Sequence, residues 1–357
     1  MNILIVPDSF KGSLSSKEVC ENIKAGIDSI QKHSITCLPF ADGGEGFGKC
    51  LCNFCNGNIL YTYCSDIYLK KVKGHIYTYG DTAIIETATA SGLQKKKDVM
   101  NATSYGTGEL IKFAVSKGFK NIILGLGGSG CCDAGAGALA ALGAVFLDID
   151  GDEIDFPAGK DLNNIYGAGF TNIVKDINFT FACDVENVFF GKNGAAYVFA
   201  KQKGANDKQV KELDDGLKMI NAFLPRDIRN VKGGGSAGGI CGALYSVYGG
   251  KIKSGFDILS EAADLEEKIK ASDIVITGEG KTDKQTLMGK LVFKISELCK
   301  KYDKKCIVMS GDIENVKLGD KMYSLVEKNI SKEDAIKNAD NLLYEKAKLV
   351  IKELNKA

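Results

Sequence analysis

Short apolar runs alternate with amphipathic segments along much of the chain, and this rhythm predicts an α/β fold with a parallel sheet. Residues 3–6 form the first run. After a loop, Ser15 and Glu18 have the spacing of a capping box, which indicates the start of a helix. The apolar positions that follow recur at helical intervals, at Val19, Ile23, Ile27 and Ile30. The first 30 residues therefore predict a strand followed by a helix.

Further candidates for buried strands share a β-branched run, and most are followed by glycine or acidic residues. They are residues 36–40, 122–126, 273–277, 306–309 and 322–326. In open α/β sheets, ligands bind beyond the carboxyl ends of the strands. The loops after these runs are therefore the first places to look for a functional site.

The middle of the chain has a different pattern. Residues 59–61, 74–79 and 83–86 have the partial alternation of short antiparallel strands. We predict a Rossmann-like domain made of residues 1–58 and 266–357, with a second α/β domain, residues 59–265, inserted into it. Residues 105–145 could belong to either domain.

Composition narrows the class of protein. The chain has 357 residues, 45% of them hydrophobic and 25% charged, which is typical of a soluble globular protein with two domains. A net charge of +1 gives no broad attraction for nucleic acid or for a membrane, so we expect small-molecule partners. The apolar run at residues 3–6 is too short for an export signal, and a cytoplasmic location is expected. A homodimer is one assembly that the sequence leaves open.

Residues 125–130 form a literal GxGxxG after a predicted strand, with a helix expected behind it. Asp148, at the end of the next apolar run, occupies the place of a ribose-binding acid. An NAD-dependent oxidoreductase that uses this loop is therefore one interpretation. The same backbone amides would serve any phosphate, and a tight structural turn has the same signature.

Two more glycine-rich loops precede predicted helices, at residues 233–239 and 277–283. The second approaches a Walker A ending but has Val275 where the first glycine should be. Three such loops favour a triphosphate and a second anionic substrate, held between two domains.

Phosphoryl transfer needs cations, magnesium-binding carboxylates and an acceptor for the proton of the attacking hydroxyl. The sequence places residues of each type near strand ends, at Asp8, Ser9, Lys11, Asp42, Glu45, Asp184, Asp283 and Lys290.

A series of loop motifs then resembles the bacterial glycerate kinase family. The matching segments begin with PDSFKGSLS at 7–15, ADGGEG at 41–46 and GLGGSGCCDAGAG at 125–137. ACDVEN at 182–187, QKGA at 202–205, GGGSAGG at 233–239 and TGEGKTDKQTLMGK at 277–290 follow in the same order.

That resemblance implies transfer of the ATP γ-phosphate to D-glycerate, with 2-phosphoglycerate as the usual product and Mg²⁺ accompanying the nucleotide. It also implies a flavodoxin-like domain with an inserted mixed α/β domain and an interdomain cleft. Asp184 or Asp283 would orient or deprotonate the substrate hydroxyl, and both are candidates for holding Mg²⁺ through the nucleotide. Lys11 and Lys290 would offset negative charge, and Asp8 completes the catalytic set.

The other residues that the motifs suggest would bind substrate or nucleotide. They are Ser9, Asp42, Gly43, Gly44, Glu45, Gly127, Gly128, Ser129, Asp133, Gly234, Gly235, Gly278, Glu279 and Gly280.

The chain departs from the family pattern at Tyr105, at Cys131-Cys132 and at Leu291-Val292. Tyr105 stands where the family has an arginine that could anchor a carboxylate by two hydrogen bonds. A related hydroxy acid as substrate, 3-phosphoglycerate as product and a nucleotide-binding paralogue without turnover therefore stay open beside the main interpretation.

Overall fold

Residues near the start of the chain and residues near its end pair in one five-stranded sheet. In this computed structural model, which describes residues 1–41 and 46–355, the sheet is parallel and has the order β15-β13-β11-β1-β2. Counted along the chain, the order is 2-1-3-4-5, which is the flavodoxin-like arrangement. The predicted Rossmann/flavodoxin-like sheet is confirmed.

This sheet and its helices form the first of two units. Its strands are β1 (Asn2–Pro7), β2 (Ser34–Cys37), β11 (Ile274–Gly278), β13 (Lys305–Ser310) and β15 (Lys321–Ser324). A short parallel pair joins β12 (Lys281–Thr282) and β14 (Asp312–Ile313). The helices are α1 (Ser16–Asp28), α9 (Leu265–Ala271), α10 (Leu291–Lys301), α11 (Lys332–Lys337) and α12 (Ala339–Leu354).

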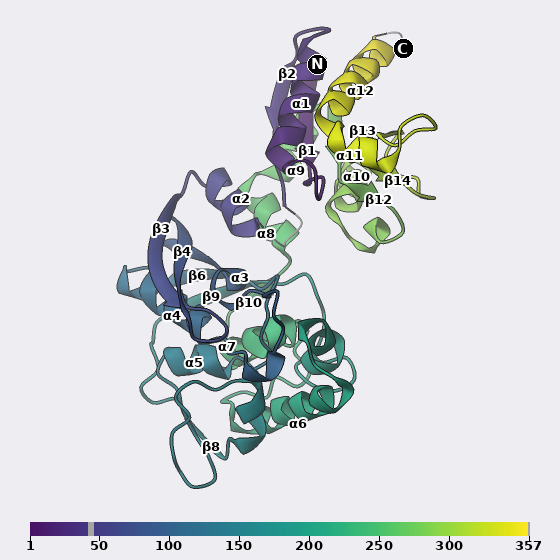
Figure 1. The fold of residues 1–357 in the computed structure, drawn as a ribbon. Coiled ribbons are helices and arrows are strands. Elements are labelled where there is room, and N and C mark those ends of the chain that lie inside the picture. The colour runs from purple at the N-terminus through teal and green to yellow at the C-terminus, as the bar shows by residue number, and fades with distance from the viewer. Residues whose placement is uncertain (42–45, 356–357) are drawn as a thin grey trace. The chain divides into compact units, whose positions relative to one another are not determined.

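Both faces of the parallel sheet are covered. Ile3 and Ile5 of β1 point into a core that α1 and α12 complete, and these two helices lie side by side near the chain ends (Figure 1). Leu4 and Val6 are buried on the other face, where α10 packs against β11 and β13. Helix α1 begins at the predicted capping box, since the Glu18 N–H donates to Ser15 Oγ at 3.3 Å.

The second unit is built on a mixed six-stranded sheet in the order β10-β9-β6-β5-β4-β3. Its strands are β3 (Asn58–Ser65), β4 (Lys71–Tyr79), β5 (Thr82–Glu86), β6 (Asn121–Gly125), β9 (Asn178–Ala182) and β10 (Lys251–Lys253). The predicted antiparallel strands are β3, β4 and β5, and parallel pairing starts between β5 and β6. The inserted mixed α/β unit is therefore confirmed.

Six helices and one hairpin accompany this sheet in the part of the chain that the structure describes. The helices are α2 (Phe47–Phe54), α3 (Thr87–Ser91), α4 (Tyr105–Ser116), α5 (Ala136–Ala141), α6 (Asp207–Phe223) and α7 (Ile240–Tyr248). The hairpin pairs β7 (Val145–Leu147) with β8 (Gly167–Gly169).

The first unit comprises Met1–Asp42 and Leu259–Ala357, and the second comprises Gly43–Ile258. The sequence placed these divisions at residues 58/59 and 265/266. The first division lies earlier because α2 packs against β4 and β5. The second lies within α8 (Gly255–Ala262). Residues 105–145, which the sequence left unassigned, belong to the second unit.

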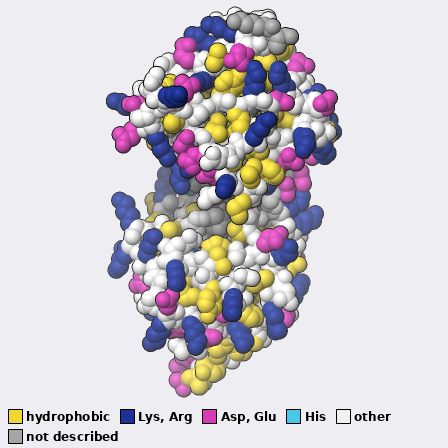
Figure 2. Space-filling model, turned by 90° about the vertical axis from the view of Figure 1, so that its right-hand side faces the viewer, with side chains coloured by type: hydrophobic (Ala, Val, Ile, Leu, Met, Phe, Trp, Pro, Cys, Tyr) yellow, Lys and Arg dark blue, Asp and Glu magenta, His cyan; other side chains and the backbone are white. Residues whose placement is uncertain are grey.

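Charged side chains of both signs are spread over the face that Figure 2 shows, in line with the net charge of +1. No helix among the described residues is long and apolar enough to cross a membrane.

Candidate functional site

The first unit has a cavity of about 340 Å³ beside the carboxyl ends of β1 and β11. The chain order of the sheet reverses between these two strands, which is where open α/β sheets bind ligands. Six predicted site residues line the cavity, namely Asp8, Ser9, Lys11, Glu279, Gly280 and Lys290. Two motifs that are far apart in the sequence, residues 7–15 and 277–290, thus meet at one place.

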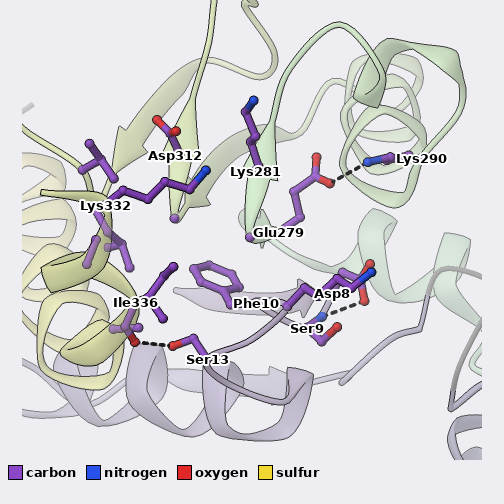
Figure 3. A pocket seen from close by; sticks show the side chains of 17 residues that line it. Asp8, Ser9, Phe10, Ser13, Glu279, Lys281, Lys290, Asp312, Lys332 and Ile336 are labelled. Atoms are coloured by element: carbon purple, nitrogen blue, oxygen red, sulfur yellow. Dashed lines mark hydrogen bonds and ion pairs between the residues drawn. The ribbon is translucent and has the colours of Figure 1, made fainter. Parts of the chain in front are cut away.

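Glu279 is the deep carboxylate of this cavity, with 7% of its surface exposed. It accepts hydrogen bonds from the hydroxyls of Thr282, at 3.2 Å, and Thr286, at 2.6 Å. Lys290 lies at the start of α10 with its Nζ 3.7 Å from Glu279 Oε2 (Figure 3). Hydroxyls and a nearby ammonium are the partners that a buried carboxylate needs.

The turn after β1 supplies a second part of the wall. The Asp8 N–H donates to the Gly278 carbonyl at 2.9 Å, which fixes the turn against the end of β11. Gly278 has to be glycine, because a Cβ there would overlap the Met309 carbonyl oxygen of β13. Asp8 Oδ1 accepts from the Ser9 N–H at 2.6 Å. Asp8 and Ser9 therefore reach the cavity from a rigid strand end.

The other side of the cavity contains residues that the sequence analysis did not single out as site residues. Its wall is apolar at Phe10, Leu325, Val326, Ala335, Ile336 and Ala339. Lys332 and Asp312 lie on this side, whereas Glu279 and Lys290 lie on the other (Figure 3). Together with Lys281, the cavity has four lysines and three carboxylates. Of these charged residues, Lys281 lies in β12 and inside a motif, whereas Asp312 in β14 and Lys332 in α11 lie outside the motifs.

Asp283 follows β12 but does not line the cavity. Its Oδ1 accepts from the Gln285 N–H at 2.8 Å, and its Oδ2 lies 3.4 Å from Lys281 Nζ. The hydrogen bond from Gln285 and the charge of Lys281 lower the pKa of Asp283. The carboxylate is therefore ionised at neutral pH.

The second unit contains the glycine loop of residues 125–130. Gly125, Gly127 and Gly128 line a cavity of about 260 Å³ together with Gly46, Glu86, Ala88, Gly92 and Leu93. Gly128 has a φ of +72°, a left-handed conformation that favours glycine. Ser129 is 8% exposed.

The geometry of this loop differs from that of a dinucleotide-binding turn. The sequence predicted a helix directly after the loop, but α5 begins only at Ala136, because buried residues 131–134 intervene. Asp148 does not follow a strand of the main sheet. It follows β7, which pairs with β8 in a separate hairpin. The Asp148 side chain accepts from the backbone of its own turn, at Asp150 and Asp152. The arrangement that an NAD-dependent oxidoreductase would use is absent from these described elements.

Three predicted binding residues of the second unit are buried. Asp133 is fully buried and accepts from the Ser104 N–H at 2.6 Å and from Ser104 Oγ at 2.7 Å. Burial raises its pKa. Gly234 and Gly235 are buried as well, and a Cβ on Gly235 would overlap the Val188 carbonyl oxygen. In this structure these three residues hold loops together.

Asp184 is exposed just beyond β9 in the second unit. Its Oδ1 accepts from the Gly255 N–H at 3.0 Å at the start of α8. Asp42, Gly43, Gly44 and Glu45, which were also predicted to bind substrate or nucleotide, lie outside the described residues.

Comparisons with known proteins agree with this architecture. The profile of the Glycerate kinase family matches residues 3–355. A glycerate 2-kinase of Escherichia coli (strain K12) is 40% identical over 326 residues, covering 88% of this chain and 86% of the relative. A glycerate kinase of Bacillus cereus is 35% identical over 98% of this chain and 96% of its own. A crystal structure of a protein assigned as glycerate kinase 2 from Salmonella typhimurium LT2 matches with a TM-score of 0.88 at 35% identity, covering 100% of this chain and 98% of the other.

Proposed function

The chain belongs to the glycerate kinase family, and from this premise we propose that it transfers the γ-phosphoryl group of ATP to D-glycerate, releasing ADP and 2-phosphoglycerate. One observation carries the proposal. The cavity at the ends of β1 and β11 combines an apolar wall, four lysines and a deep carboxylate. Phosphoryl transfer is catalysed mainly by positioning and by charge stabilisation, and this cavity offers groups for both.

We assign the nucleotide to this cavity. The apolar wall formed by α11 and the residues near it suits a flat nucleobase, since Ile336 and Val326 would shield the ring from water. Lys11 and Lys290 stand beside Asp8 and Glu279 near the strand ends, where phosphate oxygens would meet cations. The size of the cavity, about 340 Å³, lies within the usual range for small-molecule sites.

The carboxylates fit Mg²⁺ as the companion of ATP. Magnesium prefers oxygen ligands and usually binds one or two carboxylates together with substrate phosphates. Asp8 and Glu279 are carboxylates in the cavity, and Asp283 and Asp184 are the acids that the motifs suggest. When bound, the metal would neutralise charge that builds up on the phosphates.

We propose that Asp283 or Asp184 accepts a hydrogen bond from the substrate hydroxyl and orients it for attack. A carboxylate with a lowered pKa, such as Asp283, is a weak base. That suffices for orientation, because a loose phosphoryl-transfer transition state needs little proton abstraction before the phosphorus–oxygen bond breaks.

The test is a coupled assay of ADP release with the purified chain, Mg-ATP and D-glycerate, followed by NMR of the phosphorylated product. ADP release that depends on D-glycerate, with phosphate on the 2-hydroxyl, would establish the proposal. Phosphate on the 3-hydroxyl would keep the substrate and correct the product. Stimulation by other hydroxy acids alone would keep the kinase class and remove D-glycerate.

Nucleotide binding without any product would instead identify a paralogue that has lost turnover. The cytoplasmic location and the homodimer stay predictions of the sequence.

A further inference from the structure

Lys203 is a buried lysine that belongs to the QKGA segment and has no role in the function described so far. Only 3% of its surface is exposed. Its Nζ donates to Ser129 Oγ at 2.9 Å and to the Cys131 carbonyl oxygen at 2.7 Å. Both acceptors are uncharged, and both lie at the end of the glycine loop.

The local backbone explains why Lys203 points inward. A π-helical turn, Ala196–Ala200, is followed directly by a 3₁₀ turn, Lys201–Lys203. Gly204 then ends the helix with a φ of +103°, and a Cβ there would lie 2.8 Å from the Lys97 carbonyl oxygen. π-Helical turns are rare and often occur at functional sites. Lys201, two residues earlier, points outward, with 63% of its side chain exposed.

The two hydrogen-bond partners of Lys203 Nζ among the described residues are both uncharged. None of the ion pairs among the described residues includes Lys203. Asp133, the fully buried acid two residues after Cys131, is held by Ser104 and by the N–H groups of Gly135 and Gly137. A buried ammonium without a carboxylate partner lowers the stability of the folded state. That cost is offset when an anion binds close by.

The glycine loop provides a place for such an anion. The Ser129 hydroxyl accepts from Lys203 and keeps its own proton available for donation. Among the described residues, none accepts a hydrogen bond from the backbone amides of Gly127, Gly128 or Ser129. Gly127 and Gly128 are exposed and line the 260 Å³ cavity. Glu86 lines it too and accepts from the Gly48 N–H at 3.1 Å.

We propose that Lys203 is a positioning residue that makes the glycine loop an anion-binding site. Its ammonium fixes Ser129 and the end of the loop, and its positive charge lies beside Ser129, the residue that follows Gly127 and Gly128. The ligand is an anionic group with oxygen acceptors, either a phosphate of the nucleotide or the carboxylate of the hydroxy acid. This inference rests on the proposed function for the identity of the two ligands.

The test compares Lys203→Met with Lys201→Met by steady-state kinetics with each substrate varied in turn. Both variants remove an ammonium from the same 3₁₀ turn, but only Lys203 contacts the loop. Lys203→Met should raise one KM about tenfold or more, because the local concentration of the anion falls. Lys201→Met should leave both KM values unchanged. A rise in the KM for ATP identifies a phosphate as the ligand, and a rise in the KM for D-glycerate identifies the carboxylate.

A purely structural role would lower the melting temperature and the amount of active enzyme without changing either KM. If both KM values stay within about twofold of the wild type, or both rise by the same factor, the proposal is wrong. Activity of the wild-type chain, measured first, separates this outcome from failure of the proposed function.

Ser129→Ala provides a second test if Lys203→Met does not fold. It keeps the ammonium and removes the hydroxyl, and it should raise the same KM severalfold. If Lys203→Met folds, the double variant should lose less than the two single effects combined, since both residues act at one site. An unchanged KM in Ser129→Ala would overturn the proposal.

Discussion

Asp283 is a residue whose role can be tested by pH. Its hydrogen bond from Gln285 and the charge of Lys281 lower its pKa, so the carboxylate stays ionised as the pH falls through neutrality. If the ionised form orients the substrate, kcat/KM should stay at its full value as long as Asp283 is ionised. It should fall only at a pH below about 3.9, the usual pKa of an aspartate. Asp283→Asn should reduce kcat at least about a hundredfold, whereas Asp340→Asn, at an exposed position of α12, should not.

The role of Asp184 can be tested by the same type of substitution. Asp184→Asn keeps an oxygen that can accept from the Gly255 N–H, so the start of α8 should remain intact. If Asp184 acts on the hydroxyl, its kcat should also fall about a hundredfold. Near-normal turnover in either variant removes that acid from the mechanism.

Ile336 tests the assignment of the nucleotide. This side chain is 44% exposed at the apolar wall of the cavity. Ile336→Asp would place a carboxylate where we put the nucleobase. Because the variant loses an apolar contact with the base and adds a charge, the KM for ATP should rise about tenfold or more. Ile336→Leu is the matched control. An unchanged KM for ATP in the aspartate variant would place the base elsewhere.

The motifs identified one side of the cavity better than the other. Asp8, Lys11 and Glu279 follow strand ends, and the position of a strand end can be inferred from an apolar run. Lys332 could not be found in this way, because only the tertiary packing of α11 brings it to the cavity.

The residues that depart from the family pattern differ in how deeply the structure buries them. The side chains of Cys131, Cys132, Leu291 and Val292 are all buried at 0–1% exposure, so these departures change the packing of the core. Tyr105 is half-buried, and its ring packs edge-on against Phe156 at 4.8 Å between centroids. It therefore remains the departure that bears most directly on the choice of substrate.

The pairing of α1 with α12 in the first unit can be tested by a single substitution. A Cβ on Gly26 would overlap the Tyr344 carbonyl oxygen and lie 2.8 Å from Ala347 Cβ. Gly26→Val should therefore lower the free energy of unfolding by about 1–3 kcal/mol, the usual cost of overpacking. Ala25→Val puts the same side chain on the exposed neighbouring position and should change stability by less than about 0.7 kcal/mol. Urea titrations followed by circular dichroism would compare them. Helix propensity alone would make Gly26→Val slightly stabilising, so a Gly26→Val variant no less stable than Ala25→Val would contradict the overpacking.

Elements with a strong apolar pattern could be predicted, and those formed by tertiary pairing could not. The runs at 3–6 and 306–309 fall inside β1 and β13. β10, with the sequence Lys-Ile-Lys, has no apolar run and is a strand only because it pairs with β9. The helix expected right after Gly130 starts six residues later, since residues 131–134 are buried and irregular.

At the scale of the whole molecule, the second unit is an insertion between two strands of the first. β2 ends at Cys37 and β11 begins at Ile274, yet both flank β1. The sequence predicted this nesting because the strand–helix rhythm stops and then returns. The first division lies before α2 and not after it, because α2 packs on β4 and β5 of the second unit, a tertiary contact that the sequence pattern does not show.

This nesting predicts which parts of the chain fold alone. Residues 43–258 contain a complete six-stranded sheet with its own core, so this segment should show a cooperative thermal transition by circular dichroism. Residues 1–42 lack β11, the partner of β1, and should be unfolded. The first unit should fold only when residues 1–42 and 259–357 are joined by a flexible linker. A broad transition in the 43–258 segment would mean that its core depends on the rest of the chain, and a folded 1–42 segment would mean that β1 and α1 need no partner strand.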